Sequence, residues 1–139
     1  MEISCGTILH TVMDGVVHYV LLQADDGYCG FPKGHMEKGE TEIETALRET
    51  WEETSVRARI FDGFRETDEY IMPNGIRKRV IYFVADYFNQ PPKHNPGFEV
   101  RNILLLPFEE AYSALTFEGS KAILRLADRF IKQIEGERS

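Results

Sequence analysis

A cluster of acidic residues in the middle of the chain has the spacing that a metal site needs. Glu52 and Glu53 follow Glu49 by three and four positions. Residues three and four apart share one face of a helix, so the three carboxylates should converge. Like charges so close repel unless cations lie among them, and hard divalent ions prefer carboxylate oxygen while leaving positions open for phosphates. The spacing therefore predicts a Mg²⁺ site, with Mn²⁺ as an alternative ion, that acts on a phosphate-containing substrate.

Arg48 stands beside these carboxylates and should organise them. It lies four residues before Glu52, where its guanidinium can pair with one carboxylate and fix that rotamer while the others face the metal ions. An acidic run can also be simply the solvated face of a helix, and for three glutamates alone that interpretation would be favoured. The full spacing from Gly34 through Glu40 to Glu53 favours the chemical interpretation.

A helix must hold these side chains in place. Thr41 followed by Glu44 forms a capping box, which predicts that the helix begins at about Glu42. Spacings of three and four predict its buried stripe, which comprises Ile43, Leu47, Thr50 and Thr54. The opposite face is then expected to carry the acidic residues Glu42, Glu49, Glu52 and Glu53.

The segment before this helix reads as strands followed by a loop. Residues 3–12 and 16–25 are predicted strands, joined by a hairpin turn at Asp14-Gly15. Residues 25–40 are rich in glycine and contain Pro32. They are predicted to form a loop whose backbone can approach a ligand closely.

The segment after the helix alternates between strands and helices. Strand-like runs cover residues 56–71 and 76–88, with a turn at Asn74-Gly75, and the second run has the pattern of a strand covered on both faces. The remaining predicted elements are a loop over residues 89–97, a strand over 102–108, and helices over 108–115 and 120–134. Strands interleaved with helices indicate an α/β or α+β layer arrangement.

Length and composition set limits on the class of protein. A chain of 139 residues with 42% hydrophobic content predicts a single domain over residues 1–139. The net charge of -7 argues against binding of long nucleic acid, although a small nucleotide can still be held by metal ions and local cations. Cys5 and Cys29 form no CxxC pair, which fits a reduced, cytoplasmic setting. We expect no leader and no membrane-spanning segment, and we expect either a monomer or a homodimer.

The acidic stretch resembles the Nudix box, G-x5-E-x7-R-E-x2-E-E-x-G, over its full length. The one departure is Ser55, which replaces the closing glycine of the box. That glycine has a left-handed conformation, so serine there should cost about 1 kcal/mol of local strain. The resemblance implies an αβα sandwich with a mixed sheet between helices. It also implies that Glu49, Glu52 and Glu53, with the backbone carbonyl of Gly34, form the cradle for divalent ions.

The chemistry of such a site is hydrolysis of a phosphoanhydride bond. Metal ions neutralise phosphate oxygens, lower the pKa of an attacking water and stabilise the leaving phosphate. A carboxylate must accept the proton of that water. Glu49 and Glu99 are the two candidates, and the sequence does not decide between them.

Residues outside the box indicate which members of the Nudix family the chain resembles most. FPKGHMEKGET, LLQADDG and KRVIYFVADY look similar to the asymmetric diadenosine tetraphosphate hydrolases, which are bis(5'-nucleosyl)-tetraphosphatases. The resemblance implies that Lys78 contacts the polyphosphate chain and that Tyr82 and Phe117 stack on the two faces of an adenine. It also places Glu99 as a metal-binding or basic glutamate. There the match weakens, because the family's following His and Glu/Gln are Val100 and Arg101 here.

Each substrate-binding assignment has a structural alternative. Tyr82 and Phe117 can equally be core aromatic residues. Lys78, flanked by two arginines, can belong to an exposed basic edge strand. Lys33 is predicted to contact phosphate, and His35 is predicted to lie near the phosphates rather than to bind zinc.

Two competing functions stay open. The same metal site would serve a hydrolase of another nucleoside di- or triphosphate, of an RNA 5' end, or of an inositol pyrophosphate, because the pocket sets the specificity. A Nudix-like domain that binds a nucleotide without hydrolysing it is the second alternative. Loss of a metal-binding glutamate would be its signature, and the glutamates of the box are all present.

Overall fold

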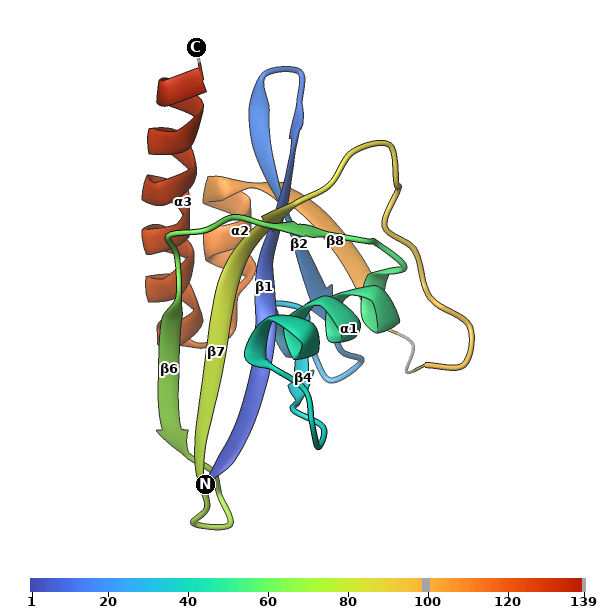
Figure 1. The fold of residues 1–139 in the computed structure, drawn as a ribbon, viewed down its shortest axis with the longest axis vertical. Helices are drawn as coiled ribbons and strands as arrows, with labels where there is room; N and C mark the ends of the chain where they lie inside the picture. The colour runs from blue at the N-terminus through green and yellow to red at the C-terminus, as the bar shows by residue number, and fades with distance from the viewer. Residues whose placement is uncertain (99–100, 139) are drawn as a thin grey trace.

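A computed structural model describes residues 1–98 and 101–138 of the chain. Within them, strands and helices alternate around one mixed sheet (Figure 1). The elements in chain order are β1 (Glu2–Met13), β2 (Val16–Gln23), β3 (Cys29–Gly30), β4 (Lys33–His35), α1 (Glu42–Thr54), β5 (Arg59–Ile60), β6 (Glu66–Ile71), β7 (Arg77–Asp86), β8 (Asn102–Pro107), α2 (Phe108–Ala114) and α3 (Glu118–Arg138).

Strand β1 lies at the centre of the sheet and pairs with three other strands. It runs parallel to β7, in a register that places Gly6 beside Tyr82 and Glu2 beside Lys78. It runs antiparallel to β2 and, over three residues, to β4. Strand β2 extends the sheet through β3 and β8, while β7 extends it through β5 and β6. The sheet therefore contains parallel and antiparallel pairs, as predicted for a mixed sheet.

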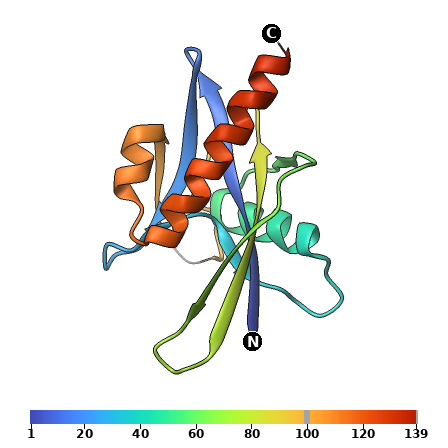
Figure 2. The same cartoon turned by 90° about the vertical axis from the view of Figure 1, so that its left-hand side faces the viewer.

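Helices cover both faces of this sheet. Helix α3 crosses one face, where Leu124 and Ile131 pack against Ile8 and Val84 (Figure 2). Helix α1 lies on the other face, where Ala46 packs with Ile81. Because residues of a strand alternate between faces, neighbouring residues of β1 and β7 belong to different clusters. The result is the αβα sandwich predicted from the sequence.

The predicted turns are present, whereas part of the predicted loop is a strand. Asp14 and Gly15 join β1 to β2 with φ angles of 52° and 78°, which is the conformation that a tight hairpin requires. Gly75, with a φ of 85°, lies in the turn between β6 and β7. The segment over residues 25–40 differs from the expectation, since it contains β3 and β4. These short strands form because their backbone groups complete the hydrogen bonding of β2 and β1.

Helix α1 begins where the capping box predicts. The Thr41 hydroxyl accepts a hydrogen bond from the Glu44 amide, and the Glu44 carboxylate accepts one from the Thr41 amide. The predicted buried stripe is only partly correct, because Ile43 is 44% exposed. The buried residues are Thr45, Ala46, Thr50 and Thr54. The helix is rotated relative to the prediction because its small polar residues contact the sheet, as in the 2.8 Å hydrogen bond between Thr50 and Thr7.

The last predicted strand and helices are also present. Strand β8 and helix α2 end within one residue of the predicted bounds, and α3 is longer at both ends than predicted. Among the described residues, no helix is long and apolar enough to cross a membrane.

Candidate active site

Arg48 joins the acidic residues of the site into one network. Its guanidinium donates two hydrogen bonds to Glu40, at 2.7 and 3.0 Å, and one each to Glu49 at 2.9 Å and Glu52 at 3.0 Å. A further bond, of 2.9 Å, reaches the backbone carbonyl of His35. Arg48 lowers the pKa of the Glu40 carboxyl to about 2. The predicted pairing with Glu52 is therefore seen, and Glu40 is an additional and bidentate partner.

Gly34 lets the backbone of β4 approach the Glu49 carboxyl. A Cβ atom at position 34 would lie 2.0 to 2.3 Å from the three carboxyl atoms of Glu49, so any other residue there would force the Glu49 carboxyl to move. Gly34 is held in place by pairing with Cys5 on β1. Burial raises the pKa of Glu49, although Arg48 opposes this effect. The Gly34 backbone therefore lies next to the carboxyl oxygens of Glu49.

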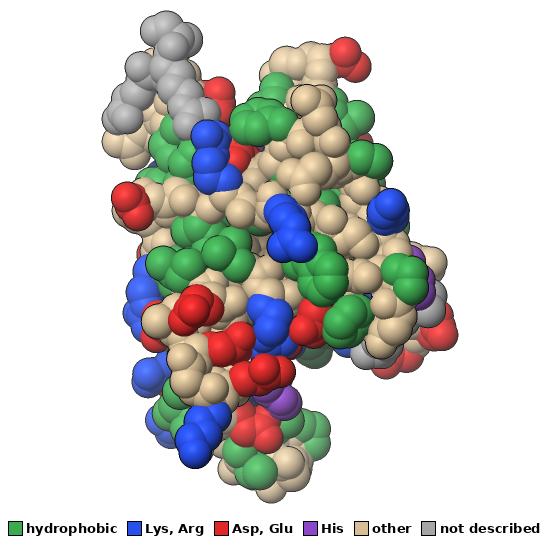
Figure 3. All heavy atoms as spheres, turned by 45° about the vertical axis from the view of Figure 1, so that its right-hand side comes forward, with side chains coloured by type: hydrophobic (Ala, Val, Ile, Leu, Met, Phe, Trp, Pro, Cys, Tyr) green, Lys and Arg blue, Asp and Glu red, His purple; other side chains and the backbone are tan. Residues whose placement is uncertain are grey.

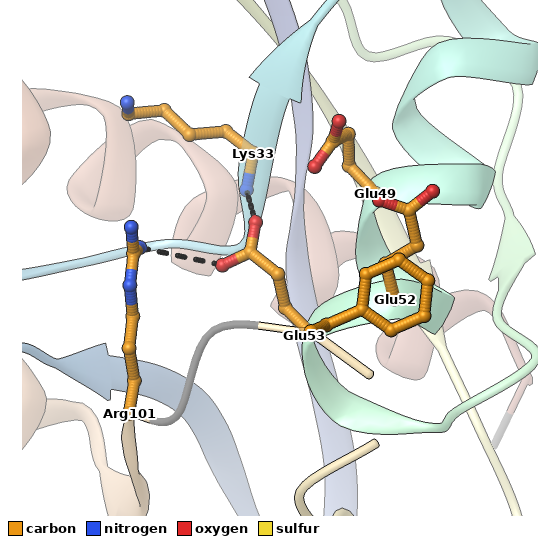
Figure 4. A pocket seen from close by; sticks show the side chains of 6 residues that line it. Lys33, Glu49, Glu52, Glu53 and Arg101 are labelled. Atoms are coloured by element: carbon orange, nitrogen blue, oxygen red, sulfur yellow. Dashed lines mark hydrogen bonds and ion pairs between the residues drawn. The ribbon is translucent and has the colours of Figure 1, made fainter. Parts of the chain in front are cut away.

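Glu53 links the helix to the strand side of the site. Its carboxylate accepts a hydrogen bond of 3.1 Å from the Lys33 amide and forms an ion pair of 3.4 Å with Arg101 (Figure 4). Burial raises the pKa of Glu53 to about 7, even though Arg101 and the Lys33 amide favour the charged form. A cation beside this buried carboxyl favours its charged form.

A pocket of about 200 Å³ opens beside these side chains. It is lined by Lys33, Glu49, Glu52, Glu53, Phe98 and Arg101. Phe98 packs edge-to-face on Trp51 of α1, with the ring centroids 6.1 Å apart. Acidic and basic side chains gather side by side on the lower half of the face in Figure 3. Such a mixture can bind metal ions and the phosphates of one ligand together.

The residues of the site fit a divalent cation, although they are arranged for other partners here. In the described part of the chain, no three His, Cys, Asp or Glu side chains lie close enough to share an ion. Glu49 and Glu52 turn toward Arg48, while Glu53 turns toward Arg101. The three carboxylates nevertheless offer oxygen ligands, which hard cations prefer. The backbone of Gly34 lies beside the carboxyl of Glu49.

Two lysines lie on the strand side of the site. Lys78 is only 9% exposed, and β7 lies between β1 and β6, so the alternative of an exposed edge strand is wrong for this residue. Burial, together with the nearby charge of Lys78, lowers the pKa of Lys33 to about 8. The structure thus brings together Lys33 and Lys78, the two lysines that are predicted to contact phosphate.

The two predicted stacking rings are not brought together. Tyr82 is 2% exposed and packs edge-to-face on Phe31 within the core. In this position Tyr82 matches the alternative of a core aromatic residue, because a ring without an exposed face cannot stack on a base. Phe117 is 57% exposed, and its ring lies 5.5 Å from that of Tyr28. Tyr28 is therefore the ring that the structure places next to Phe117.

The two other predicted site residues are His35 and Glu99. The side chain of His35 is exposed, 3.7 Å from Glu2 and outside the lining of the pocket. That its ring lies near the phosphates stays a prediction, and in this structure His35 does not line the pocket. Glu99 lies outside the described residues.

Sequence reasoning missed three residues that the structure brings into the site. Glu40 occupies a fixed position of the box, and that position was the signal for its role as the partner of Arg48. Phe98 and Arg101 lie within two residues of Glu99 in the sequence. The prediction that Glu99 belongs to the site was therefore the signal that could have found them. The ion pair between Arg101 and Glu53 had no signal in the sequence, because the two residues are far apart along the chain.

Known proteins match this chain in sequence and in fold. Residues 8–127 match the NUDIX domain. The chain is 35% identical to the asymmetrical bis(5'-nucleosyl)-tetraphosphatase of Mus musculus and 33% identical to that of Rattus norvegicus, each over 92% of this chain and 94% of the relative. A solved binary complex of the C. elegans Ap4A hydrolase superposes with a TM-score of 0.86 at 24% identity, covering 96% of this chain and 99% of the other.

Proposed function

This chain belongs to the NUDIX domain family of hydrolases, which act on phosphoanhydride bonds, and on that premise we propose that it cleaves a dinucleoside polyphosphate such as diadenosine tetraphosphate asymmetrically to ATP and AMP. One observation carries the proposal. The carboxylates of α1 face a pocket whose strand side is formed by Lys33, with Lys78 beside it. A polyphosphate spans such a pocket, with one end at metal ions and the other at the lysines.

The residues of α1 have separate roles in this proposal. Glu49, Glu52 and Glu53, with the backbone carbonyl of Gly34, hold Mg²⁺, for which Mn²⁺ can substitute. The bound ions would neutralise phosphate oxygens and lower the pKa of the attacking water. Arg48 fixes the rotamers of Glu49 and Glu52 through its hydrogen bonds. A glutamate takes the proton of the water, with Glu49 and Glu99 as the candidates.

The substrate is a small nucleotide in this proposal. Lys33 and Lys78 contact the phosphate chain as point charges. Phe117, whose ring is exposed beside Tyr28, offers a face on which a base can stack. In this proposal, residues 1–139 act as one domain in the cytoplasm. The similarity to asymmetrical bis(5'-nucleosyl)-tetraphosphatases supports the choice of a substrate with two nucleosides.

Product analysis tests this proposal. The purified protein with Mg²⁺ is offered diadenosine tetraphosphate, dNTPs, capped RNA, ADP-ribose and inositol pyrophosphates, and the products are resolved by chromatography. We expect ATP and AMP from the tetraphosphate, with ¹⁸O from labelled water in only one of the two products. Formation of two ADP molecules would contradict asymmetric cleavage. A large preference for ADP-ribose or an inositol pyrophosphate would leave the NUDIX chemistry intact and overturn the substrate.

A further inference from the structure

Phe117 and Tyr28 form an aromatic pair where the segment before α3 meets β3. Their rings lie 5.5 Å apart. The Thr116 amide donates to the Cys29 carbonyl at 3.1 Å, and the Cys29 amide donates to the Thr116 hydroxyl at 2.8 Å. The Phe117 carbonyl also accepts a bond of 3.1 Å from the Lys121 amide of α3. Phe117 is therefore held at a definite place while 57% of its surface stays exposed.

The carboxylate of Asp68 lies beside the helix turn that follows Phe117. A Cβ atom at Gly119 would lie 2.6 to 2.9 Å from the three carboxyl atoms of Asp68, and Gly119 follows Phe117 by two residues. In β6, Asp68 pairs with Val80 of β7, so the two side chains share one face of the sheet. Val80 packs in the cluster that contains residues of α3. Asp68 therefore lies between β6 and the first turn of α3.

Tyr70 links Asp68 to the aromatic pair. It follows Asp68 by two residues on the same face of β6, opposite Lys78. Burial, and then the charge of Asp68, raises the pKa of Tyr70. Burial, and then Tyr70, raises the pKa of Tyr28. Asp68, Tyr70 and Tyr28 are thus near neighbours.

Lys33 connects this group to the pocket beside α1. The registers of β4, β1 and β7 place the Lys33 side chain on the same face as Tyr82. Figure 4 shows it directed away from Glu49. Burial raises the pKa of Asp68 and that of Glu53, and the charge of Lys33 opposes both effects. Lys33 is therefore within electrostatic reach of a carboxylate on either side.

The Asp68 carboxylate can accept hydrogen bonds from a ligand. Within residues 1–98 and 101–138, its oxygens take part in no salt bridge and in no hydrogen bond. An ionised carboxylate is an acceptor only. The 6-amino group of adenine is a donor at the edge of a flat ring. A carboxylate beside an aromatic face can therefore bind the amino group of a base that stacks on that face.

We propose that Asp68 determines which base is bound, because its carboxylate accepts a hydrogen bond from the 6-amino group of an adenine that stacks on Phe117. This inference rests on the proposed function, since it places one nucleoside of the dinucleoside polyphosphate, with Lys33 at its phosphates. A site that forms a hydrogen bond with a substrate N–H rejects an analogue that lacks it. Asp68 is a specificity-determining residue in this arrangement and takes no part in the reaction itself.

The position of Asp68 also has a purely structural alternative. A carboxylate near the first turn of α3 is attracted by the positive end of the helix dipole. Such a role would lower the melting temperature when Asp68 is replaced, without any dependence on the base. The two roles differ in one respect, which is whether removing the amino group from the ligand and removing the carboxylate from the protein have coupled effects.

Binding of two monophosphates to the full chain tests this coupling. AMP and purine riboside 5'-monophosphate differ only in the 6-amino group. Neither contains a phosphoanhydride bond, so isothermal titration calorimetry measures binding without turnover. The unchanged protein should bind AMP about tenfold more tightly than the analogue, because the analogue lacks a hydrogen bond to a charged acceptor. In Asp68→Ala the ratio should fall to about one, and in Asp68→Asn, which keeps a neutral acceptor, to about three.

Glu69→Gln is the matched control. Glu69 is the next residue of β6, and it pairs with Arg79 on the opposite face of the sheet. This variant should keep the tenfold ratio. An equal ratio in the unchanged protein and in folded Asp68→Ala would overturn the inference, whatever the melting temperature. Asp68→Asn provides a second reading if the alanine variant folds poorly, and a ratio that stays tenfold there would overturn the inference as well.

The result can be separated from the proposed function. Product analysis of diadenosine tetraphosphate decides whether ATP and AMP are formed, however the base is held. Asymmetric cleavage together with an unchanged ratio in Asp68→Ala would leave the proposed function intact and refute the role of Asp68. Loss of the ratio in a protein that forms no ATP and AMP would support Asp68 as the residue that selects the base and count against the proposed reaction.

Discussion

The two sides of the pocket satisfy their charges in different ways. On the α1 side, the carboxylates of Glu49, Glu52 and Glu53 are all within ion-pair distance of an arginine of the same chain. On the strand side, no carboxylate of residues 1–98 or 101–138 forms a salt bridge with Lys33 or Lys78. Buried charges are normally paired. In the proposed function, the phosphates of the substrate would supply such an anion.

This difference separates two kinds of binding. The acidic side must give up internal partners before it can hold a cation, so its affinity for metal reflects a competition within the protein. On the basic side two like charges lie close together, and in the proposed function a phosphate would relieve their repulsion. Substitutions on the two sides should consequently affect different kinetic constants.

The largest effect is expected on the acidic side. Glu53→Gln keeps the size of the side chain and removes its charge, so turnover should fall by roughly three or more powers of ten while the fold is kept. Addition of EDTA to the unchanged protein should have the same result. Circular dichroism serves as the control for folding. Near-normal turnover of folded Glu53→Gln with EDTA present would rule out a metal mechanism.

On the basic side, the change should appear mainly in binding. Lys78→Ala removes a buried cation from the phosphate site, and we expect the KM for diadenosine tetraphosphate to rise by roughly 10- to 100-fold with a smaller change in kcat. The enzyme should also cut the tetraphosphate at more than one phosphoanhydride bond, so that ADP appears beside ATP and AMP. Arg79→Ala is the neighbouring control, because Arg79 pairs with Glu69 at the surface. Equal effects of the two substitutions would mean that Lys78 acts only through overall charge.

A pair of aromatic substitutions distinguishes the ligand surface from the core. Phe117→Ala should raise the KM by roughly tenfold, as expected for about 1–3 kcal/mol of base stacking, and leave the melting temperature little changed. Tyr82→Ala should instead lower the free energy of unfolding by about 3–5 kcal/mol, because Tyr82 packs within the core. A stable Tyr82→Ala protein with a raised KM would restore the predicted clamp.

The pH dependence of kcat/KM provides a finer comparison. The pKa of Lys33 is lowered to about 8, so its ammonium is charged below that pH and neutral above it. Attraction for phosphate is therefore lost as the pH rises through about 8, and kcat/KM should fall there. Lys33→Arg stays charged at higher pH. If the profile of that variant falls at the same pH, another group is responsible.

The smallest effect is expected at the end of α1, at a residue that does not line the pocket. Ser55 has a φ of 61°, the left-handed conformation predicted for it. Ser55→Gly should raise the free energy of unfolding by about 1 kcal/mol in urea denaturation, with turnover nearly unchanged. A large change in turnover would mean that the helix end also positions Glu53.

Local signals in the sequence predicted much of the fold. The capping box at Thr41 and the turn at Asp14-Gly15 act through neighbouring residues, so they can be read without tertiary contacts. The orientation of α1 could not be predicted in the same way. Ile43 has the spacing of a buried residue, yet the contact between Thr50 and Thr7 decides which face meets the sheet.

The site was predictable where one element carries it. Glu49, Glu52 and Glu53 share a helix, and the pairing of Arg48 with Glu52 followed from their four-residue spacing. Tyr82 lies on a strand that is buried on both faces, where alternation does not tell which face borders the ligand. The partners of Arg101 and of Gly34 depend on contacts between distant segments, and such contacts require the fold itself.

The central position of β1 also determines when in folding the pocket can exist. Its parallel pairing with β7 joins Glu2 to Lys78, so a long stretch of chain must be closed before that contact forms. Helix α1 and the β1–β2 hairpin are local and can appear early. During synthesis, a chain that has not yet emerged as far as β7 already carries the glutamates of α1 but lacks Lys78. Refolding monitored by nucleotide binding should therefore lag behind refolding monitored by helix content.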